Sequence, residues 1–357
     1  MSTRGLIQTF ERWRLTGEPM VLATVYETIG STYSKAGHRI LIAANGDYRG
    51  LVSGGCLEGD LAERARGVIE SNQPLAISFD MRDEADDLWG LGVGCNGLIR
   101  VFLQPLTEAE DYQPFSGIAR GLLDAAPTVV ATVIVGAGGD DGGGFSTGAT
   151  LIWNGGDAGA GSLEVLVAGC REAQAAGSAI FRRESSGAAV LYAPIKPILR
   201  LLVLGAGLDA VPVVNMAAEL GWRVTVADHR PAYLEKGVFE AAEDARLIDP
   251  ARISSELEPD RFDAIIVMSH HLMTDQTYLE QLAEVPAGYL GVLGPKDRRE
   301  RLLSALGDTG KTLEGRLKGP VGLDIGADDP ESIALSLLAE MHAVLAGATG
   351  RTLTTTD

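Results

Sequence analysis

The stretch from Leu199 to Ala210 reads LRLLVLGAGLDA, and it decides the fold of the C-terminal part of the chain. Its apolar residues are typical of a buried strand, which we expect to stop at Gly205. Gly205, Gly207 and Ala210 form the pattern G-x-G-x-x-A at the start of a predicted helix over 210–220. The first glycine permits a tight turn, the second lets a pyrophosphate approach, and the helix N-terminus faces the phosphate. We therefore expect these three residues to bind a cofactor.

A second strand of the same unit is expected over 223–227, and it ends at Asp228, whose carboxylate could accept from a ribose hydroxyl. Further buried strands are predicted over 264–268 and 288–293. Ligands in such folds bind at the carboxyl ends of the strands. Three more residues stand in loops after strands and are predicted to contact a cofactor: Arg230, His270 and Gly294. The sequence thus predicts an α/β protein with a Rossmann-like parallel sheet at its C-terminal end.

Two other features of this region have a specific interpretation. His270, His271 and Asp275 suggest a metal site or acid–base chemistry, but for His271 we favour local capping or hydrogen bonding. A final helix is predicted over 330–345, capped by Asp328 or Asp329.

A second glycine-rich stretch, residues 52–60, reads VSGGCLEGD. We expect a strand over 49–52 to end at the two glycines and a helix to follow over 57–70. The predicted buried side of this helix carries Leu57, Leu61, Ala65 and Val68, and its predicted solvent side carries Glu58, Glu63 and Arg64.

Cys56 falls at or just before the start of this helix. Free backbone N–H groups and the positive end of the helix dipole meet there and would stabilise a thiolate. Gly54 and Gly55 allow a bulky or anionic ligand to approach the backbone closely. The alternative is a Gly-Gly turn followed by a small buried residue that happens to be cysteine.

The composition limits the classes of function. The chain has 357 residues, 46% of them hydrophobic, and a net charge of −18, so nucleic acid and anionic membrane surfaces are disfavoured as partners. Its three cysteines, Cys56, Cys95 and Cys170, form neither a disulfide framework nor the spacing of a zinc site. We expect a reducing, cytoplasmic setting, because there is no signal-peptide core and no apolar run of membrane-spanning length.

The front half of the chain contains a diverged internal repeat. Residues 19–25 and 127–133 read PMVLATV and PTVVATV, and residues 37–47 and 148–157 read GHRILIAANGD and GATLIWNGGD. A helix and two strands are expected to follow in each copy, over 57–70, 75–79 and 98–105, then over 163–175, 179–181 and 188–194. Each copy is expected to be a small α+β unit of mostly antiparallel strands, and the two could pack as a pseudo-dimer. Chance similarity between β-hairpins is the alternative.

The predicted domains are an α+β domain over 1–110, a diverged second copy over 111–195, a Rossmann-like domain over 196–346 and a tail over 347–357. The copies differ where chemistry is expected, since SGGCLEG in the first is GAGSLEV in the second. The first copy also inserts residues 80–97, which contain Gly94 and Cys95. We expect Cys56 and Cys95 to converge on one pocket, whereas Cys170 is expected in the core.

Several motifs occur together in one order: GSTYSKAGHRILIAANGDYRGLVSGGCLEG, GVGCNG, LLVLGAGLDAVPV, VADHR, MSHH, YLGVLGPKDRRERL and GPVGLDIGADDPESIALSLLAEM. In these motifs the chain resembles the XdhC/CoxI family of accessory proteins for xanthine dehydrogenase and related molybdenum hydroxylases. Two positions depart from the family pattern, because Ser269 stands where threonine is common and His271 where an acidic residue is common.

The resemblance implies a chaperone that binds molybdenum cofactor (molybdopterin), protects it during sulfuration and delivers it to an apo molybdenum hydroxylase. A cysteine desulfurase would be a second partner, and a homodimer stays open. On this reading Cys56 and Cys95 hold molybdenum or pass sulfur, acting as metal and catalytic residues, and Gly54, Gly55 and Gly94 contact the cofactor.

The residues alone leave two other functions open. The first is an NAD(P)-dependent oxidoreductase that uses the Rossmann-like domain, with His229 or His270 as proton donor. The second is a scaffold that senses a dinucleotide. Fold resemblance alone does not choose between them.

Overall fold

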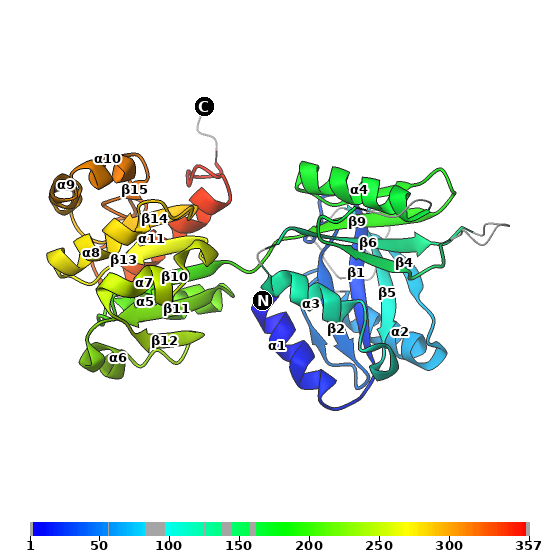
Figure 1. Cartoon of the computed structure of the whole chain (residues 1–357). Helices are drawn as coiled ribbons and strands as arrows, with labels where there is room; N and C mark the ends of the chain where they lie inside the picture. The colour runs from blue at the N-terminus through cyan, green and yellow to red at the C-terminus, as the bar shows by residue number, and fades with distance from the viewer. Residues whose placement is uncertain are drawn as a thin grey trace. The chain divides into compact units, whose positions relative to one another are not determined.

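The computed structural model describes residues 3–55, 57–82, 97–124, 126–137, 145–157 and 162–354. The chain divides into two compact units, residues 1–197 and 198–357 (Figure 1). Cys56, Gly94 and Cys95 lie outside the described residues. Within the described ranges, no helix is both long enough and apolar enough to cross a membrane.

The second unit is built on a parallel sheet with the strand order β12-β11-β10-β13-β14-β15. Its strands are β10 (Arg200–Leu204), β11 (Arg223–Asp228), β12 (Asp244–Leu247), β13 (Ala264–Val267), β14 (Tyr289–Val292) and β15 (Leu317–Lys318). Numbered from the first strand of the unit, this is the order 3-2-1-4-5-6 of a Rossmann fold. The predicted α/β class with a C-terminal parallel sheet is therefore confirmed.

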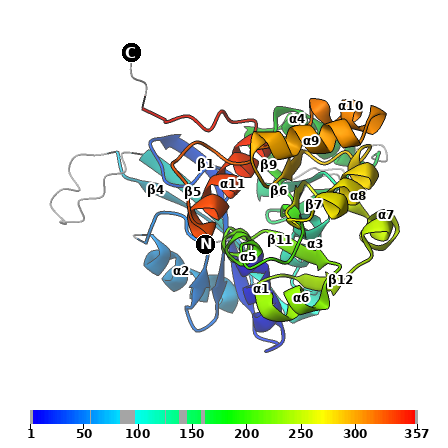
Figure 2. The same cartoon turned by 90° about the vertical axis from the view of Figure 1, so that its left-hand side faces the viewer.

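Helices cover both faces of this sheet (Figure 2). One face carries α5 (Ala210–Glu219) and α11 (Pro330–Leu345). The other is covered by α7 (Ile253–Glu256), α8 (Leu272–Leu282), α9 (Lys296–Ala305) and α10 (Asp308–Glu314). The remaining segments are α6 (Pro231–Gly237) and two short 3-10 helices, Pro250–Arg252 and Pro259–Arg261.

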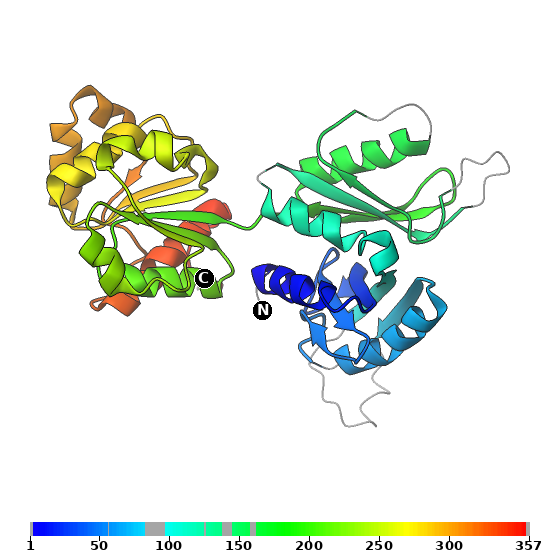
Figure 3. The same cartoon turned by 60° about the horizontal axis from the view of Figure 1, so that its bottom comes forward.

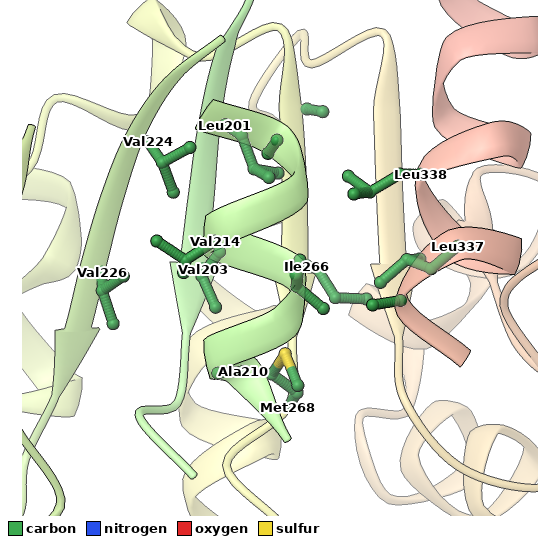
Figure 4. Packing of buried hydrophobic residues seen from close by; sticks show 14 of the residues in the cluster. Leu201, Val203, Ala210, Val214, Val224, Val226, Ile266, Met268, Leu337 and Leu338 are labelled. Carbon is green, nitrogen blue, oxygen red and sulfur yellow. The ribbon is translucent and has the colours of Figure 1, made fainter. Parts of the chain in front are cut away.

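Successive strand residues point to opposite faces, so each strand contributes to two apolar clusters. Leu201 and Val203 pack toward α5 and α11, where Figure 4 shows them beside Val214 and Ile266. The intervening Leu202 packs into the cluster on the other face. Burial on both faces explains why β10 is an uninterrupted apolar run.

The helix α11 begins and ends where the sequence predicts. Asp329 is its N-cap and accepts a hydrogen bond from the Ser332 backbone N–H at 2.7 Å, while Pro330 occupies the first turn.

The first unit contains two antiparallel sheets, with strand orders β3-β2-β1-β5-β4 and β7-β6-β9-β8. The first copy comprises α1 (Thr3–Arg14), β1 (Met20–Gly30), β2 (Arg39–Ala43), β3 (Tyr48–Arg49), α2 (Glu58–Ser71), β4 (Leu75–Asp80) and β5 (Gly97–Leu106). A 3-10 turn, Glu108–Glu110, leads to the second copy: α3 (Phe115–Leu123), β6 (Thr128–Val135), β7 (Thr150–Trp153), α4 (Ser162–Ala176), β8 (Ile180–Arg183) and β9 (Ala189–Ile195). Helix and strand order agree between the copies, apart from the extra β3.

The two copies also agree in the detail of their backbone. The Val25 carbonyl accepts from the Gly37 N–H at 2.8 Å, and the Val133 carbonyl accepts from the Gly148 N–H at the same distance. Both glycines have positive φ, +92° and +88°. The long strands β1 and β6 change register directly after Val25 and Val133, respectively. Val25 and Gly37 are thus equivalent to Val133 and Gly148, as the proposed repeat requires.

Each sheet buries one face under its own helix and presents the other face to the second sheet (Figure 3). Helix α2 packs on the first sheet and α4 on the second. Between the two sheets lie Tyr26, Phe102, Ile134, Leu191 and Ala193. The two copies therefore share a common core inside one unit.

One strand prediction is wrong. The expected strand over 49–52 is instead the short β3, Tyr48–Arg49, and Val52 lies in a loop although it is buried. Gly50 breaks the strand because its φ is +115°, and a Cβ there would lie 2.6 Å from Ile40 Cγ2.

Candidate functional site

The glycine loop of the first unit is organised by one carboxylate. Glu58 is the first residue of α2, and its side chain turns back into the loop that precedes the helix. Its Oε1 accepts from the backbone N–H groups of Val52 and Ser53 at 2.8 and 2.9 Å. Its Oε2 accepts from the Ser53 hydroxyl at 2.8 Å and from the Gly55 N–H at 2.9 Å. Both carboxylate oxygens are thus fully engaged in holding the loop.

The prediction that Glu58 lies on the solvent side of the helix is wrong, because the residue is completely buried. It shares the buried stripe of α2 with Leu61, Ala65 and Val68. Burial raises the pKa of Glu58, but hydrogen bonds from Ser53 and Val52 outweigh that effect, and the pKa lies below its ordinary value. The carboxylate is therefore charged at neutral pH.

The two loop glycines are required by their backbone conformation. Gly54 and Gly55 have φ values of +77° and +122°. A Cβ on Gly55 would meet no atom within 4 Å, and one on Gly54 would meet only the ring of Tyr33, at 3.9 Å. The backbone at these glycines is therefore not covered by other side chains, and their contact with a cofactor stays a prediction.

The predicted metal and catalytic residues Cys56 and Cys95 lie outside the described residues, and so does Gly94. Their roles and their convergence on one pocket stay predictions. Among the described residues, no group of three or more His, Cys, Asp and Glu side chains could hold a metal ion. Cys170 is fully buried in the second copy, and burial raises the pKa of its thiol to about 12. That placement confirms its predicted place in the core.

In the second unit, the loop after β10 is shaped by Gly205, which has a φ of +128°. A Cβ at this position would lie 2.4 Å from the Met268 carbonyl oxygen, so the loop after β13 approaches too closely for any side chain. The tight turn predicted for Gly205 is present. The next N–H, of Ala206, donates to the Asp228 carboxylate at 2.8 Å.

Asp228 is fully buried at the end of β11, and its carboxylate forms hydrogen bonds with other residues of the protein. Its Oδ1 accepts from the backbone N–H and the Nε of Arg230, both at 2.9 Å, and its Oδ2 accepts from Arg230 Nη2 at 2.8 Å. Burial raises the pKa of Asp228, but these bonds and the one from Ala206 outweigh it and lower the pKa. Asp228 thus fixes both the glycine loop and Arg230. Its role toward a ribose stays a prediction.

A second ionic pair joins the loops that follow β10 and β13. His270 Nε2 lies 2.7 Å from Asp209 Oδ2, and the pKa of His270 is raised, chiefly by this hydrogen bond. His270 has a φ of +60°, which is unusual for a residue other than glycine. His271 Nδ1 instead accepts from the Thr274 backbone N–H and caps α8, which confirms the local role favoured for it.

Helix α9, which follows the loop after β14, contacts the loop after β13 through Asp275 of α8, which is fully buried. Asp275 accepts from the Ser269 hydroxyl on one oxygen and from Arg298 Nη2 on the other, both at 2.5 Å. Arg298 passes close to Gly294, where a Cβ would lie 2.5 Å from Arg298 Cδ. Arg298 thus lies against the predicted residue Gly294, and Asp275 holds Arg298 in place. No sequence pattern indicated either role.

Comparison with known proteins agrees with this architecture. Residues 201–341 match the XdhC Rossmann domain, and residues 13–80 match the XdhC and CoxI family. The chain is 33% identical over 325 residues to a Bacillus subtilis protein named as a probable xanthine dehydrogenase subunit, covering 91% of this chain and 92% of that protein. It is 24% identical over 332 residues to the molybdenum cofactor insertion chaperone PaoD of Escherichia coli, covering 92% and 85%.

A crystal structure described as a xanthine dehydrogenase from Bacillus halodurans has a TM-score of 0.74 and 30% sequence identity to this chain. That similarity covers 98% of this chain and 97% of the other. The matches include both units and span most of the length of the relatives. We conclude that this chain belongs to the XdhC and CoxI family.

Proposed function

We propose that this chain is a chaperone that binds molybdenum cofactor as its cargo and assists its sulfuration and its insertion into a xanthine dehydrogenase-type molybdenum hydroxylase. The observation that carries the proposal is the loop held by Glu58, whose residue Gly55 directly precedes Cys56 in the sequence. The name of the Escherichia coli relative, molybdenum cofactor insertion chaperone, supports the same function.

The loop suits a cargo-binding role because its conformation is set in advance. The N–H groups of Val52, Ser53 and Gly55 already donate to Glu58, so little ordering is left for the moment of binding. Gly54 and Gly55 leave the backbone accessible. A thiolate at Cys56, joined by Cys95, would be a soft ligand of the kind that molybdenum accepts. An apo hydroxylase and a cysteine desulfurase are the partners this function requires.

The test is retention of cargo during purification. The full chain and its Cys56→Ala variant are purified without oxygen from cells that make the cofactor, and molybdenum content and pterin fluorescence are then measured. We expect Cys56→Ala to lose the cargo, because the metal loses its protein ligand. Cys170→Ala is the matched control and should retain it, since Cys170 is buried in the other copy. Equal cargo in Cys56→Ala and the unchanged chain would contradict the proposal.

The second unit raises a rival function, an NAD(P)-dependent oxidoreductase. Its strand order and the conformation of Gly205 favour a dinucleotide. The Asp228 carboxylate, however, is buried and engaged with Arg230 and Ala206, so a ribose hydroxyl would have to compete for it. His229 Nδ1 lies 3.3 Å from Asp228 Oδ1 and has no hydrogen-bond partner among the described residues. Saturable binding of NADH in a fluorescence titration, with turnover of a substrate, would favour this rival.

A further inference from the structure

A cavity of about 620 Å³ lies within the first unit, between the two copies. Residues 33, 35–39 and 50–51 of the first copy form one wall, and residues 177–179 and 193–196, at the end of the second copy, form another. Helices α1 and α3 contribute apolar side chains, among them Leu6, Phe115 and Ile118. A cavity of this size is typical of small-molecule sites.

The charge of this cavity is opposite to that of the chain. Its lining includes Lys35, His38, Arg39 and Lys196 and no aspartate or glutamate, although the net charge of the chain is −18. Within the described part of the chain, Lys35, Lys196 and Arg39 form no ion pair. Four basic groups thus gather around one space with no anion of the described residues among them.

Arg39 is the least expected of these groups. Its guanidinium makes no hydrogen bond to any described residue, and burial lowers its pKa to about 10. Burial also lowers the pKa of His38, and the nearby charges of Arg39 and Lys35 lower it further. A cation that is partly removed from water and has no partner costs free energy unless a ligand supplies the opposite charge.

The internal repeat provides a comparison for this cavity, because side chains of the protein bridge the equivalent crevice on the other side. There the Gln104 side-chain amide donates to the Gly148 carbonyl oxygen at 2.9 Å and to Thr150 Oγ1 at 3.3 Å. The ring of Pro74 packs against Gly148, 3.3 Å from where a Cβ would be. Side chains of the protein itself therefore fill this crevice.

Strand registers identify the corresponding residues on the open side. Arg39 pairs with Thr24 of β1 as Thr150 pairs with Thr132 of β6. By the same registers and the equivalence of the two glycines, Ala193 corresponds to Gln104, Gly37 to Gly148 and Arg39 to Thr150. All three line the cavity. The space exists because a small alanine stands where the other copy has a bridging glutamine, and Arg39 brings a charge where the other copy has a hydroxyl.

We propose that this cavity binds a phosphate ester of a flat heterocycle, with its phosphate on Arg39, Lys35 and Lys196. This inference rests on the proposed function and names the part of the protein that holds the phosphate end of the pterin cargo. The apolar side chains of α1 and α3 would cover the heterocycle. Tyr33 lines the cavity and also lies beside Gly54, so the cavity borders the loop that leads to Cys56.

The test measures equilibrium binding to the cargo-free full chain by calorimetry and fluorescence. The probes are inorganic pyrophosphate, GMP and molybdopterin released from a molybdenum enzyme under anaerobic conditions. We expect Arg39→Met to raise the dissociation constant for molybdopterin about 10- to 100-fold, because a charge-assisted contact to phosphate is lost. Ala193→Gln should weaken binding to a similar extent by rebuilding the closed crevice. Arg171→Met removes the same charge from an exposed pair with Asp157 and should change binding less than about twofold.

The unfolding temperature distinguishes a ligand-binding role of Arg39 from a purely structural one. Arg39→Met should unfold at the same temperature as the unchanged chain or a higher one, because it removes a partly buried cation without a partner. An unchanged dissociation constant in Arg39→Met would overturn the inference. GMP binding that depends on Arg39, without molybdopterin binding, would overturn the pterin assignment in favour of a nucleotide. Arg39-dependent molybdopterin binding supports the cavity even if Cys56→Ala retains its cargo, which is the separate failure of the proposed function.

Discussion

Replacing Glu58 by glutamine should loosen the loop that carries Cys56 while leaving the rest of the first unit folded. In the unchanged chain, Oε1 accepts two backbone N–H groups, and a glutamine oxygen can keep both. The other oxygen accepts from the Gly55 N–H and the Ser53 hydroxyl. An amide NH₂ group at that position would face a donor, so at least one bond is lost and the remaining bonds no longer involve a charge.

The size of the effect follows from those contacts. Hydrogen bonds to a charged group contribute about 1.5–3 kcal/mol each, and two of the four are lost or rearranged. Gly55 is exposed and Ser53 only half-buried, so water will recover part of the loss. We expect the free energy of unfolding of the first unit to fall by about 2–4 kcal/mol.

At acidic pH, the difference in free energy of unfolding between the unchanged chain and Glu58→Gln should become smaller. The pKa of Glu58 in the folded protein lies below its ordinary value of 4.5. The charged carboxylate therefore contributes stability above pH 4.5, and that contribution is lost as the pH falls through the lowered pKa. The unchanged chain and Glu58→Gln should differ at pH 7 and converge in acid.

Two measurements check this prediction. Urea unfolding followed by circular dichroism gives the free energy, and hydrogen exchange with mass spectrometry reports the N–H groups of Val52, Ser53 and Gly55. Loss of 2–4 kcal/mol corresponds to about 30-fold faster exchange or more, since 1.4 kcal/mol is a factor of ten. Glu63→Gln is the matched control, because Glu63 is on the same helix, is 79% exposed and lies 3.9 Å from Arg66. Exchange in Glu58→Gln as slow as in Glu63→Gln would refute the reasoning.

Three further predictions concern the described residues. Asp228→Asn should lower the free energy of unfolding of the second unit by about 3–5 kcal/mol, because it removes the charge that pairs with Arg230, and a loss below about 1 kcal/mol in urea unfolding would contradict this. Asp209→Asn should lower the pKa of His270, which an NMR titration measures. The His270–Asp209 pair stabilises the fold below pH 6.5, and this contribution is lost as the pH rises through the raised pKa. An unchanged titration curve would show that Asp209 does not raise the pKa of His270. Cys170→Ala should leave the number of thiols that react in the native protein unchanged, because burial raises the pKa of Cys170 to about 12, and a lower count would show that this thiol is accessible.

The parallel sheet of the second unit could be predicted from the sequence because its central strands are local apolar runs with glycine at their ends. Gly205 marks the turn after β10, and the structure places it there with the positive φ that the turn needs. The edge strands β12 and β15 left no such signal. Asp244–Leu247 is largely exposed, and Leu317–Lys318 has only two residues, so neither buries enough apolar surface to show as a pattern.

The burial of Glu58 was missed for a different reason. Its position, three residues before Leu61 and seven before Ala65, already placed it on the buried stripe of the helix. Its residue type nevertheless favours the solvent side, because a lone carboxylate is rarely buried. What stabilises it is a set of N–H groups from the preceding loop, and no helical pattern records the direction in which those groups point.

The cavity could not be predicted either, because it depends on residues far apart in the sequence. Arg39 and Lys196 meet around it only through the pairing of the two sheets. The repeat itself was visible in the sequence, but the replacement of Gln104 by Ala193 gains its meaning only when strand registers show that the two positions are equivalent.

The presence of both halves of the repeat in one polypeptide has a consequence for stoichiometry. Two identical subunits related by a twofold axis would carry the same residues on both sides, and so would form two identical binding sites. Here each half of the repeat has its own sequence, so Gln104 can bridge one side while the smaller Ala193 lines a cavity on the other. On the proposed function, one chain would therefore hold one cofactor molecule in this cavity.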